Sequence, residues 1–373
     1  MSTRAAEAEA RAPRVTVAFL LYNSASEAPA LVAGLLRQRH PAFASQADWL
    51  EALFVDDASS DGTADAVRGA LAAAGEPAHC RLVVHPRNLG LAGTLNELFA
   101  EALTPFVLTC HLDCRFGSDS YVASMLDRIE AHPLAAAITG QPRLPDPGRL
   151  PFAEKLNVVA NLMDVVAAPA AGLVPVGFAE GRCDVFRVEA LRRAGLYDTR
   201  LRVSGEDQVM AAKLRASGYE LYQAPDLEYQ LSVSAEQDSV AKLLRHQRLF
   251  GRTTPYIVFA VPGSRAGLVG ERAGGNRRLR ALLRATQLGS SAAYALVAVS
   301  LGVGWPGWLW GSVLALVVML KAALFARHAQ AVRFTAAELC AFALLQPLFD
   351  LAFTTGVLEG FLLLARGRAR PIG

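Results

Sequence analysis

The sequence is poor in charged residues and has no pattern typical of nucleic-acid binding. Only 19% of its 373 residues are charged and 53% are hydrophobic, with a mean hydropathy of +0.27. Soluble domains have about 25% charged residues, so part of this chain is expected to lie outside water. The formal net charge of +3 is small, and no Lys/Arg stripe with interleaved aromatic residues occurs, which argues against nucleic acid as a partner.

Cysteine usage excludes two further kinds of protein. The count is odd and no CxxC spacing occurs; the five residues are Cys80, Cys110, Cys114, Cys183 and Cys340. Neither a disulfide framework nor a structural zinc site is expected, and a reducing cytosol fits this usage. Residues 1–13 carry charges throughout and have no apolar core, so we expect a flexible tail and no signal peptide.

Hydrophobic residues are unevenly distributed along the chain. Residues 1–285 have the composition of a soluble protein, whereas long apolar stretches lie between residues 286 and 366. The length predicts about two domains. We therefore expect a tail (1–13), an α/β domain (14–255), a basic linker or interfacial segment (256–285), membrane helices (286–366) and a basic tail (367–373).

Short apolar runs alternate with helical patterns in the first third of the chain. Strands are predicted at Val15–Leu21, Leu53–Val55, Arg81–Val84 and Phe106–Cys110, with a helix after each of them. This alternation predicts an α/β fold in which crossover helices connect the strands of a mainly parallel sheet.

Polar residues follow these strands at the points where the strands end. They are Tyr22, Asn23, Asp56, Asp57, residues 85–88, His111 and Asp113. Ligands of open α/β sheets bind at the carboxyl ends of the strands. We therefore expect these side chains to gather at one edge of the sheet and to form a binding site there.

Several motifs in this order resemble family 2 glycosyltransferases of the GT-A fold, over roughly residues 15–250. They are YNSASE at 22–27, FVDDASSDGT at 54–63, Asn88-Leu-Gly-Leu with Asn96, and the stretch from FRVEALRRAGLYD to SGEDQVMAAKLRASGY at 186–219. The C-terminal apolar helices and Phe250-Gly251-Arg252 are similar to the polysaccharide-assembly branch that includes succinoglycan-type transferases.

The resemblance implies an inverting transfer of a sugar from a nucleotide-diphosphate sugar to an acceptor hydroxyl. Tyr22 and Asp57 would contact the nucleobase and Asp56 would support them. Asp207 would be the general base, with Glu206 beside it in the first turn of a helix. The remaining donor-binding residues would be Asn88, His111, Asp113, Arg115, Arg248 and Arg252, although the last two could instead face phosphate headgroups.

One element of the family pattern is altered. The expected Asp-x-Asp after the fourth strand is here His111-Leu-Asp113-Cys-Arg115. We favour the alignment in which His111 and Asp113 hold a divalent metal, because the following Arg115-Phe116 matches the register of relatives. The metal would be Mn²⁺ or Mg²⁺; both prefer oxygen ligands, and Mn²⁺ also accepts imidazole. In a rival alignment Arg115 supplies positive charge in place of a metal. Relatives often place a histidine where this sequence has Gln230.

The C-terminal region predicts a multi-pass protein of the cell membrane. Leu288–Val303 and Trp308–Ala326 are candidate spans, since about 20 apolar residues cross a bilayer. Glu338–Ala365 contains Pro347 and Asp350, so we favour a broken hairpin over a third span. The arginine cluster before the first span places the catalytic domain on the cytoplasmic side, facing a lipid-linked or saccharide acceptor.

Two other classes of protein stay open at this stage. One is a degenerate GT-A domain that binds a nucleotide sugar without turnover, as a membrane assembly subunit. The other is a transporter or assembly subunit with a vestigial domain. Arg182 and Arg187 are either solvated surface charges or substrate contacts.

Overall fold

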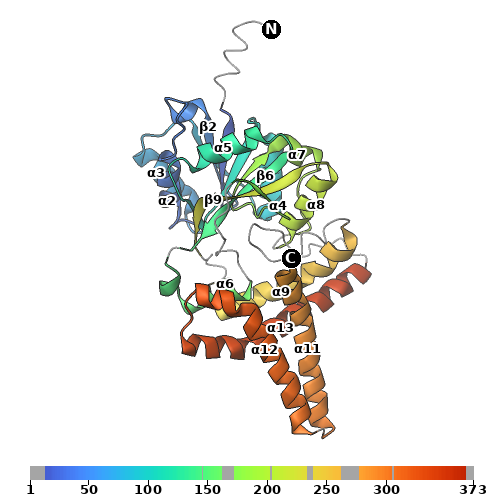
Figure 1. The fold of residues 1–373 in the computed structure, drawn as a ribbon. Coiled ribbons are helices and arrows are strands. Elements are labelled where there is room, and N and C mark those ends of the chain that lie inside the picture. Colours follow the sequence, from blue (N-terminus) through green and yellow to red (C-terminus); the bar gives the residue numbers. More distant parts are fainter. Residues whose placement is uncertain are drawn as a thin grey trace.

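The computed structural model describes residues 13–144, 146–161, 172–201, 204–232, 238–261, 277–304 and 306–366. Figure 1 shows an α/β domain that contains the N-terminal two thirds of the chain, with a group of long helices on one side of it. The residues of the site expected from the sequence lie in the α/β domain, at the ends of its strands and at the start of one of its helices.

The sheet combines a parallel half with a mixed half. Among the described residues its order is β3-β2-β1-β4-β8-β6-β9-β5, with β7 paired to β9. The first half is parallel throughout, whereas β8 runs antiparallel to both β4 and β6. The bounds are β1 Val15–Leu21, β2 Leu50–Asp56, β3 Cys80–Val84, β4 Phe106–His111, β5 Cys114–Phe116, β6 Ala135–Arg143, β7 Val174–Pro175, β8 Cys183–Arg187 and β9 Glu220–Leu231.

Helices cover both faces of the sheet. Strand β1 is buried at every position because it lies between two hydrophobic cores. Phe19 and Leu21 pack into the core with α2, α3 and α5, whereas Ala18 and Leu20 pack into the core with α4, α7 and α8. The bounds are α2 Ala28–Leu36, α3 Thr63–Ala73, α4 Gly90–Glu101, α5 Tyr121–Ala131, α6 Phe152–Ala160, α7 Val188–Arg193 and α8 Glu206–Ala216. Two-sided burial explains the unbroken apolar run of β1.

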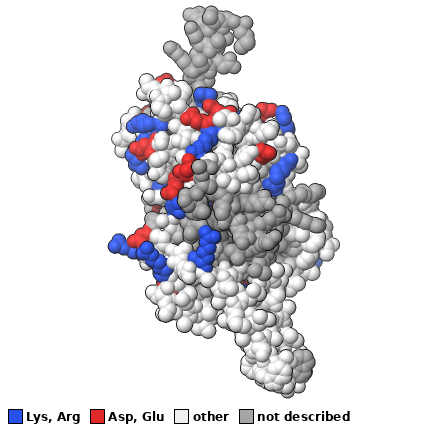
Figure 2. Space-filling view, in the orientation of Figure 1, with Lys and Arg blue, Asp and Glu red and all other residues white. Residues whose placement is uncertain are grey.

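Four long helices complete the described chain: α9 Val240–Ala260, α11 Arg277–Gly302, α12 Gly307–Ala331 and α13 Ala336–Ala365. In Figure 1, α11 and α12 run side by side away from the sheet, whereas α13 lies across them and along α9. The projecting end of this helix pair shows no Lys, Arg, Asp or Glu in Figure 2, unlike the α/β domain. Of the helices in the described ranges, α12 and α13 are long and apolar enough to cross a membrane, with hydropathies of 2.1 and 1.7.

The helical region differs from the sequence-based expectation in three respects. Residues 338–365 form part of one continuous helix instead of a broken hairpin. The predicted span Leu288–Val303 falls in α11, which is not among the two candidate spans. Helix α9 continues through Pro255 to Ala260, so no element ends at residue 255.

The continuity of α13 has a local cause. Proline removes one intrahelical hydrogen bond and bends a helix without necessarily ending it. Asp350 does not have to reach water, because its carboxylate accepts hydrogen bonds from Lys321 Nζ at 2.7 Å and from the Tyr294 hydroxyl at 3.2 Å. A buried charge with a partner is tolerated where an unpaired one is not.

Helices α9 and α13 touch backbone to backbone. A Cβ added to Gly356 would collide with the carbonyl oxygen of Arg248, and one added to Gly360 would collide with that of Arg252. On the other helix, a Cβ at Gly251 would meet the carbonyl oxygen of Phe353. The glycines at 251, 356 and 360 thus allow α13 to approach α9 closely.

Candidate active site

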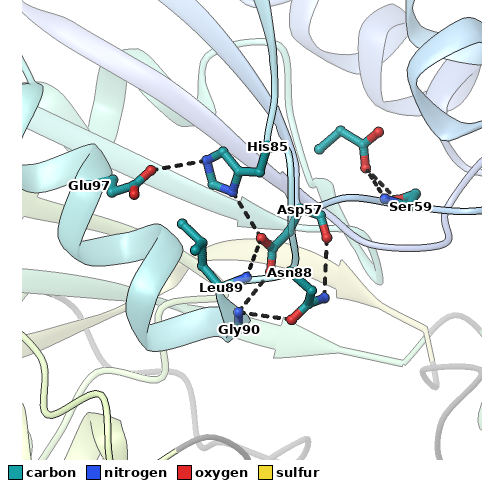
Figure 3. Close-up of polar contacts among 8 residues, drawn as sticks. Asp57, Ser59, His85, Asn88, Leu89, Gly90 and Glu97 are labelled. Atoms are coloured by element: carbon teal, nitrogen blue, oxygen red, sulfur yellow. Dashed lines mark hydrogen bonds and ion pairs between the residues drawn. The ribbon is translucent and has the colours of Figure 1, made fainter.

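Asp57 joins the end of β2 to the start of α4 (Figure 3). Its Oδ1 accepts a hydrogen bond from the Leu89 amide at 2.8 Å and lies 2.9 Å from His85 Nδ1. Its Oδ2 accepts from the Gly90 amide at 2.9 Å. A carboxylate that accepts from the first amides of a helix satisfies free donors there and interacts favourably with the helix dipole. Asp57 is therefore buried and engaged, and it positions the loop before α4.

Asn88 and His85 complete this network. Asn88 donates from Nδ2 to the Asp57 carbonyl oxygen at 3.2 Å, and its Oδ1 accepts from the Gly90 amide at 3.0 Å. His85 lies between two carboxylates, because its Nε2 is 3.2 Å from Glu97 in α4. The structure thus gives Asn88 a backbone-binding position within this loop.

The ends of β1 and β2 form a second, more open network. Asp56 Oδ1 accepts from the Ser59 amide at 3.0 Å and from the Ser59 hydroxyl. The side-chain oxygen of Asn23 accepts a hydrogen bond from the backbone amide of Ser60 at 3.0 Å. The backbone amide of Asn23 donates to Ser59 Oγ at 2.9 Å. These bonds hold the loop that carries Tyr22, whose side chain is 44% exposed and presents a ring face on which a base can stack.

His111 and Asp113 follow β4 at the same edge of the sheet. His111 Nε2 is buried and has no hydrogen-bond partner in the described part of the chain. Burial lowers the pKa of His111, so the ring is neutral at neutral pH. The Asp113 carboxylate lies 3.5 Å from Nη1 of Arg182. The Asp113 carboxylate is therefore paired with a positively charged side chain of the protein, Arg182.

Arg182 comes from the turn before β8 and is fixed through its backbone as well as its side chain. Its carbonyl oxygen accepts from the His111 amide at 2.8 Å, and its Nε lies 3.2 Å from Glu180 Oε2. Burial alone would lower the pKa of Arg182, but Asp113 and Glu180 raise it overall, so the guanidinium stays charged.

The turn that carries Arg182 depends on a buried acid. Asp184 is fully buried, and its Oδ2 accepts from the Gly181 amide at 2.7 Å. Gly181 has a φ of 76°, a conformation that glycine adopts without strain. The Thr109 hydroxyl of β4 donates to the Gly181 carbonyl at 2.6 Å. These contacts hold Glu180 and Arg182 against the end of β4.

Arg115 is engaged elsewhere. Its guanidinium pairs with Glu27 and donates to the carbonyl oxygens of Leu112 and Cys114, both at 2.7 Å. Through these contacts Arg115 stabilises the turn between β4 and β5. The arginine next to Asp113 is Arg182, which the sequence did not single out as the cation of the site.

Helix α8 brings two further acids to the site. It begins at Glu206 directly after Gly205, whose φ is 91° and whose missing Cβ leaves room for Ile257 of α9. Glu206 Oε2 is buried without a partner in the described ranges; burial raises the pKa of Glu206 and the charge of Glu180 adds to the rise. Asp207 follows in the first turn, where the helix dipole favours a carboxylate.

Electrostatic contact through Glu180 links the two sides of the site. Glu180 pairs with Arg182 on the β4 side and raises the pKa of Glu206 on the α8 side. The sequence interpretation missed Glu180, because it lies in an irregular loop without periodicity. The only sequence signal was its place two residues before Arg182 and three before the Cys183–Arg187 strand.

Arg248 and Arg252 lie on α9 beside α13. Arg248 pairs with Glu359 of α13, with Nε at 3.0 Å from the carboxylate. Arg252 has a buried Nε without a partner in the described segments. Within the described ranges, no hydrogen bond or ion pair joins either guanidinium to Asp113 or Arg182, so their donor-binding role stays a prediction.

The described residues at the end of β4 offer few side-chain ligands for a divalent cation. Within the ranges that the structure describes, no group of three or more His, Cys, Asp or Glu could hold a metal ion. His111 and Asp113 provide two ligands, and the Asp113 carboxylate already faces the Arg182 guanidinium. The predicted His111/Asp113 metal site thus stays a prediction, because the protein would supply one carboxylate and one imidazole and the donor diphosphate would have to supply further ligands.

The fold and the site define an α/β domain of the GT-A type. A parallel β3-β2-β1-β4 half continues into a mixed half, and polar strand ends meet a helix that starts with two acids. The prediction of an α/β GT-A fold from the sequence is confirmed.

Comparisons with known proteins agree with this class. Residues 16–193 match the family model described as glycosyl transferase family 2. A search of curated proteins found no match.

Two solved structures match this chain, and the first of them, with a TM-score above 0.5, is similar in fold. One is the mannosyltransferase PcManGT from Pyrobaculum calidifontis in complex with GDP-Man and Mn²⁺, with a TM-score of 0.60 and 20% identity over 94% of this chain and 87% of that one. The other is GalNAc-T7 with UDP, GalNAc and Mn²⁺, with a TM-score of 0.48 and 13% identity over 67% of this chain and 52% of that one.

Proposed function

We propose that this protein is an inverting glycosyltransferase that moves a hexosyl group from a nucleotide-diphosphate sugar to an acceptor hydroxyl. The observation that supports it best is that α8 starts with the acids Glu206 and Asp207, and that Glu180, which pairs with Arg182, raises the pKa of Glu206. A direct displacement needs a base on one side of the anomeric carbon and charge stabilisation for the leaving diphosphate on the other.

In this mechanism Asp207 accepts the proton of the acceptor hydroxyl. The acceptor oxygen forms a bond to the anomeric carbon while the bond from that carbon to the diphosphate oxygen breaks, which inverts the anomeric configuration. The positive end of the α8 dipole favours the ionised form of Asp207 before the reaction. The nucleoside diphosphate leaves with the electron pair of the broken bond.

The nucleotide end of the donor would lie over the ends of β1 and β2. Tyr22 offers an exposed ring there, and Asp56 Oδ2 has no hydrogen-bond partner in the described ranges. Asp57 has its carboxylate oriented by the α4 amides, so its contribution to the base pocket would be chiefly to hold the loop.

The acceptor is proposed to be lipid-linked and to be used at the cytoplasmic face of the cell membrane, in the synthesis of a surface polysaccharide or glycolipid. A cavity of about 760 Å³ lies among α11, α12 and α13, with Leu314, Phe325 and Phe342 in its wall and Arg333 at the turn between the last two helices. Apolar walls with two cationic side chains, Arg333 and the Asp350-paired Lys321, suit a chain that carries a phosphate. A saccharide without a lipid is the alternative acceptor.

The base assignment is tested with Asp207→Asn, which keeps the size of the side chain and removes its basicity. We expect donor binding within about twofold of wild type and a transfer rate at least about 100-fold lower. Asp65→Asn is the matched control, because Asp65 lies in the first turn of α3 and is exposed.

Two results would count against the proposal. A transfer rate for Asp207→Asn above about a tenth of wild type would exclude Asp207 as the base, because general-base catalysis contributes about 10²–10⁴-fold. Donor binding without any turnover by the wild-type protein would favour the second candidate function, a domain that binds nucleotide sugars. The replacement of the Asp-x-Asp pattern around His111 motivates that candidate.

A further inference from the structure

We propose that the guanidinium of Arg182 binds the diphosphate of the donor, at the place where other transferases would use a divalent cation. This inference rests on the proposed function and specifies how the leaving group is stabilised. It also accounts for the lack of a metal-binding group at the end of β4.

Arg182 has both the position and the free donors for this task. Two of its nitrogens are engaged, Nη1 with Asp113 at 3.5 Å and Nε with Glu180 at 3.2 Å. Its Nη2 has no partner in the part of the chain that the structure describes. Arginine carries five N–H donors in a fixed fork that matches phosphate oxygens. The side chain is 23% exposed, so it is shielded from bulk water but reachable by a ligand.

The backbone keeps this cation at the ligand-binding edge of the sheet. The bond from the His111 amide to the Arg182 carbonyl ties the turn to β4, and the Asp184 carboxylate fixes the preceding Gly181 amide. Phosphate that arrives at the carboxyl ends of β1 and β4 would therefore meet preorganised guanidinium N–H donors, whose charge is shared with Asp113 and Glu180. Preorganised donors cost no reorganisation during the reaction.

The surroundings of Arg182 argue against a metal in the same place. A divalent cation bound by Asp113 would lie next to the guanidinium, and the two positive charges would repel. Arg115 is held by Glu27 and two carbonyls, so of the two described arginines at the end of β4, Arg182 is the one with a nitrogen available.

The test compares nucleotides that differ by one phosphate. Binding of UDP, UMP, GDP and GMP to the full-length protein in detergent is measured by calorimetry, with EDTA and with Mn²⁺. We expect the wild type to prefer the diphosphate of its base in EDTA, with an affinity that Mn²⁺ changes by less than about threefold. Arg182→Met should lose at least about tenfold in diphosphate affinity and less than about twofold in monophosphate affinity, because a charge-assisted hydrogen bond is worth about one to two decades.

Two more variants separate charge from folding. Arg182→Lys keeps a positive charge and should retain part of the preference for the diphosphate. Arg128→Met is the matched control: Arg128 of α5 forms a two-pronged ion pair with Asp226 of β9, and its loss should leave nucleotide affinities unchanged. A mutant that had merely unfolded would lose the monophosphate as well.

Three results would overturn the inference. The first is that the wild type prefers the diphosphate only when Mn²⁺ is present and not in EDTA. The second is that Arg182→Met prefers the diphosphate as strongly as the wild type does. The third is that Arg182→Lys loses monophosphate and diphosphate affinity equally. Each of them leaves nucleotide binding by the wild type intact, so the proposed function would stand. Failure of the wild type to bind any of the four nucleotides would overturn the proposed function together with this inference.

Discussion

At the scale of single residues, Asp57 is the polar side chain on which the nucleotide end of the site depends. It accepts from two amides at the start of α4 and contacts His85. Removal of such an acceptor leaves buried N–H groups without a partner, which costs about 1–3 kcal/mol. We therefore expect Asp57→Ala to lower the free energy of unfolding by that amount and to weaken binding of the nucleoside diphosphate.

Chemical unfolding followed by circular dichroism measures the first effect and calorimetry the second. Asp119→Ala serves as a control, because Asp119 is exposed and lies outside the network. Weaker nucleotide binding with an unchanged unfolding free energy would show that Asp57 acts through direct contact with the base, as the family resemblance implies.

Asp198 provides a pH-dependent contact between the α/β domain and α9. Burial raises its pKa, but hydrogen bonds from Arg200 and Tyr256 outweigh burial and lower the pKa to about 2. The folded-state pKa thus lies below the unfolded value of about 3.9. The contribution of the ionised Asp198 to the free energy of unfolding is therefore fully present above about pH 4 and is lost as the pH falls towards 2.

The measurement is the difference in unfolding free energy between wild type and Asp198→Asn as a function of pH. We expect a constant difference from pH 7 to about pH 4 and a steady decrease below it. A difference that does not depend on pH over this range would show that the carboxylate charge of Asp198 adds no stability.

Residues within motifs could be located from the sequence, whereas residues in irregular loops could not. Asp56, Asp57 and the acids of α8 follow recognisable strand ends or a helix start. Glu180 and Arg182 are brought to the site by a turn whose shape depends on Asp184, and this long-range packing leaves no periodic pattern in the sequence.

At the scale of helices and strands, the contact of α9 with α13 depends on glycine. Gly356→Ala places a methyl group against the Arg248 carbonyl of α9, and a backbone atom cannot move as a side chain could. Overpacking of this kind costs about 1–3 kcal/mol. We expect a lower midpoint in thermal unfolding of the detergent-solubilised protein.

Gly311→Ala is the matched control on α12, because nothing lies within 4 Å of a Cβ added at Gly311. Alanine favours the helix over glycine by about 1 kcal/mol, so this variant should be as stable as wild type or slightly more stable. Equal effects of the two substitutions would contradict close α9–α13 packing in solution.

The parallel strands could be predicted within a few residues, but the mixed half of the sheet could not. Strands β1 to β4 are short apolar runs followed by polar residues. Strand β6 begins with three alanines, which favour helix, and β9 contains Pro225, which is usual only near the edges of sheets. Their pairing depends on tertiary contacts, so local propensity gave no signal.

At the scale of the whole molecule, the crossed arrangement of the long helices predicts a membrane topology. Helices α11 and α12 project together, whereas α13 runs across them beside α9 (Figure 1). We expect the turn after α11 to reach the outside and both ends of α13 to stay at the cytoplasmic face, where the arginines lie.

Single cysteines at Gly304 and at Arg366, introduced after Cys340→Ser, measure this topology with an impermeant reagent on sealed cells. Gly304→Cys should be modified from outside and Arg366→Cys only after lysis. Native Cys340 must be removed because it is exposed. Modification of residue 366 from outside would establish a full crossing by α13 and contradict the arrangement.

The most direct test of the central claim is the stereochemistry of the reaction. The purified full-length protein, in membrane nanodiscs with polyprenyl-phosphate or lipid-saccharide acceptors, is given a panel of UDP- and GDP-sugars, and the anomeric proton of the product is followed by NMR. The account predicts transfer from one of these α-linked donors to give a β-linked product, abolished in Asp207→Asn. An α-linked product, or full activity of Asp207→Asn, would contradict it.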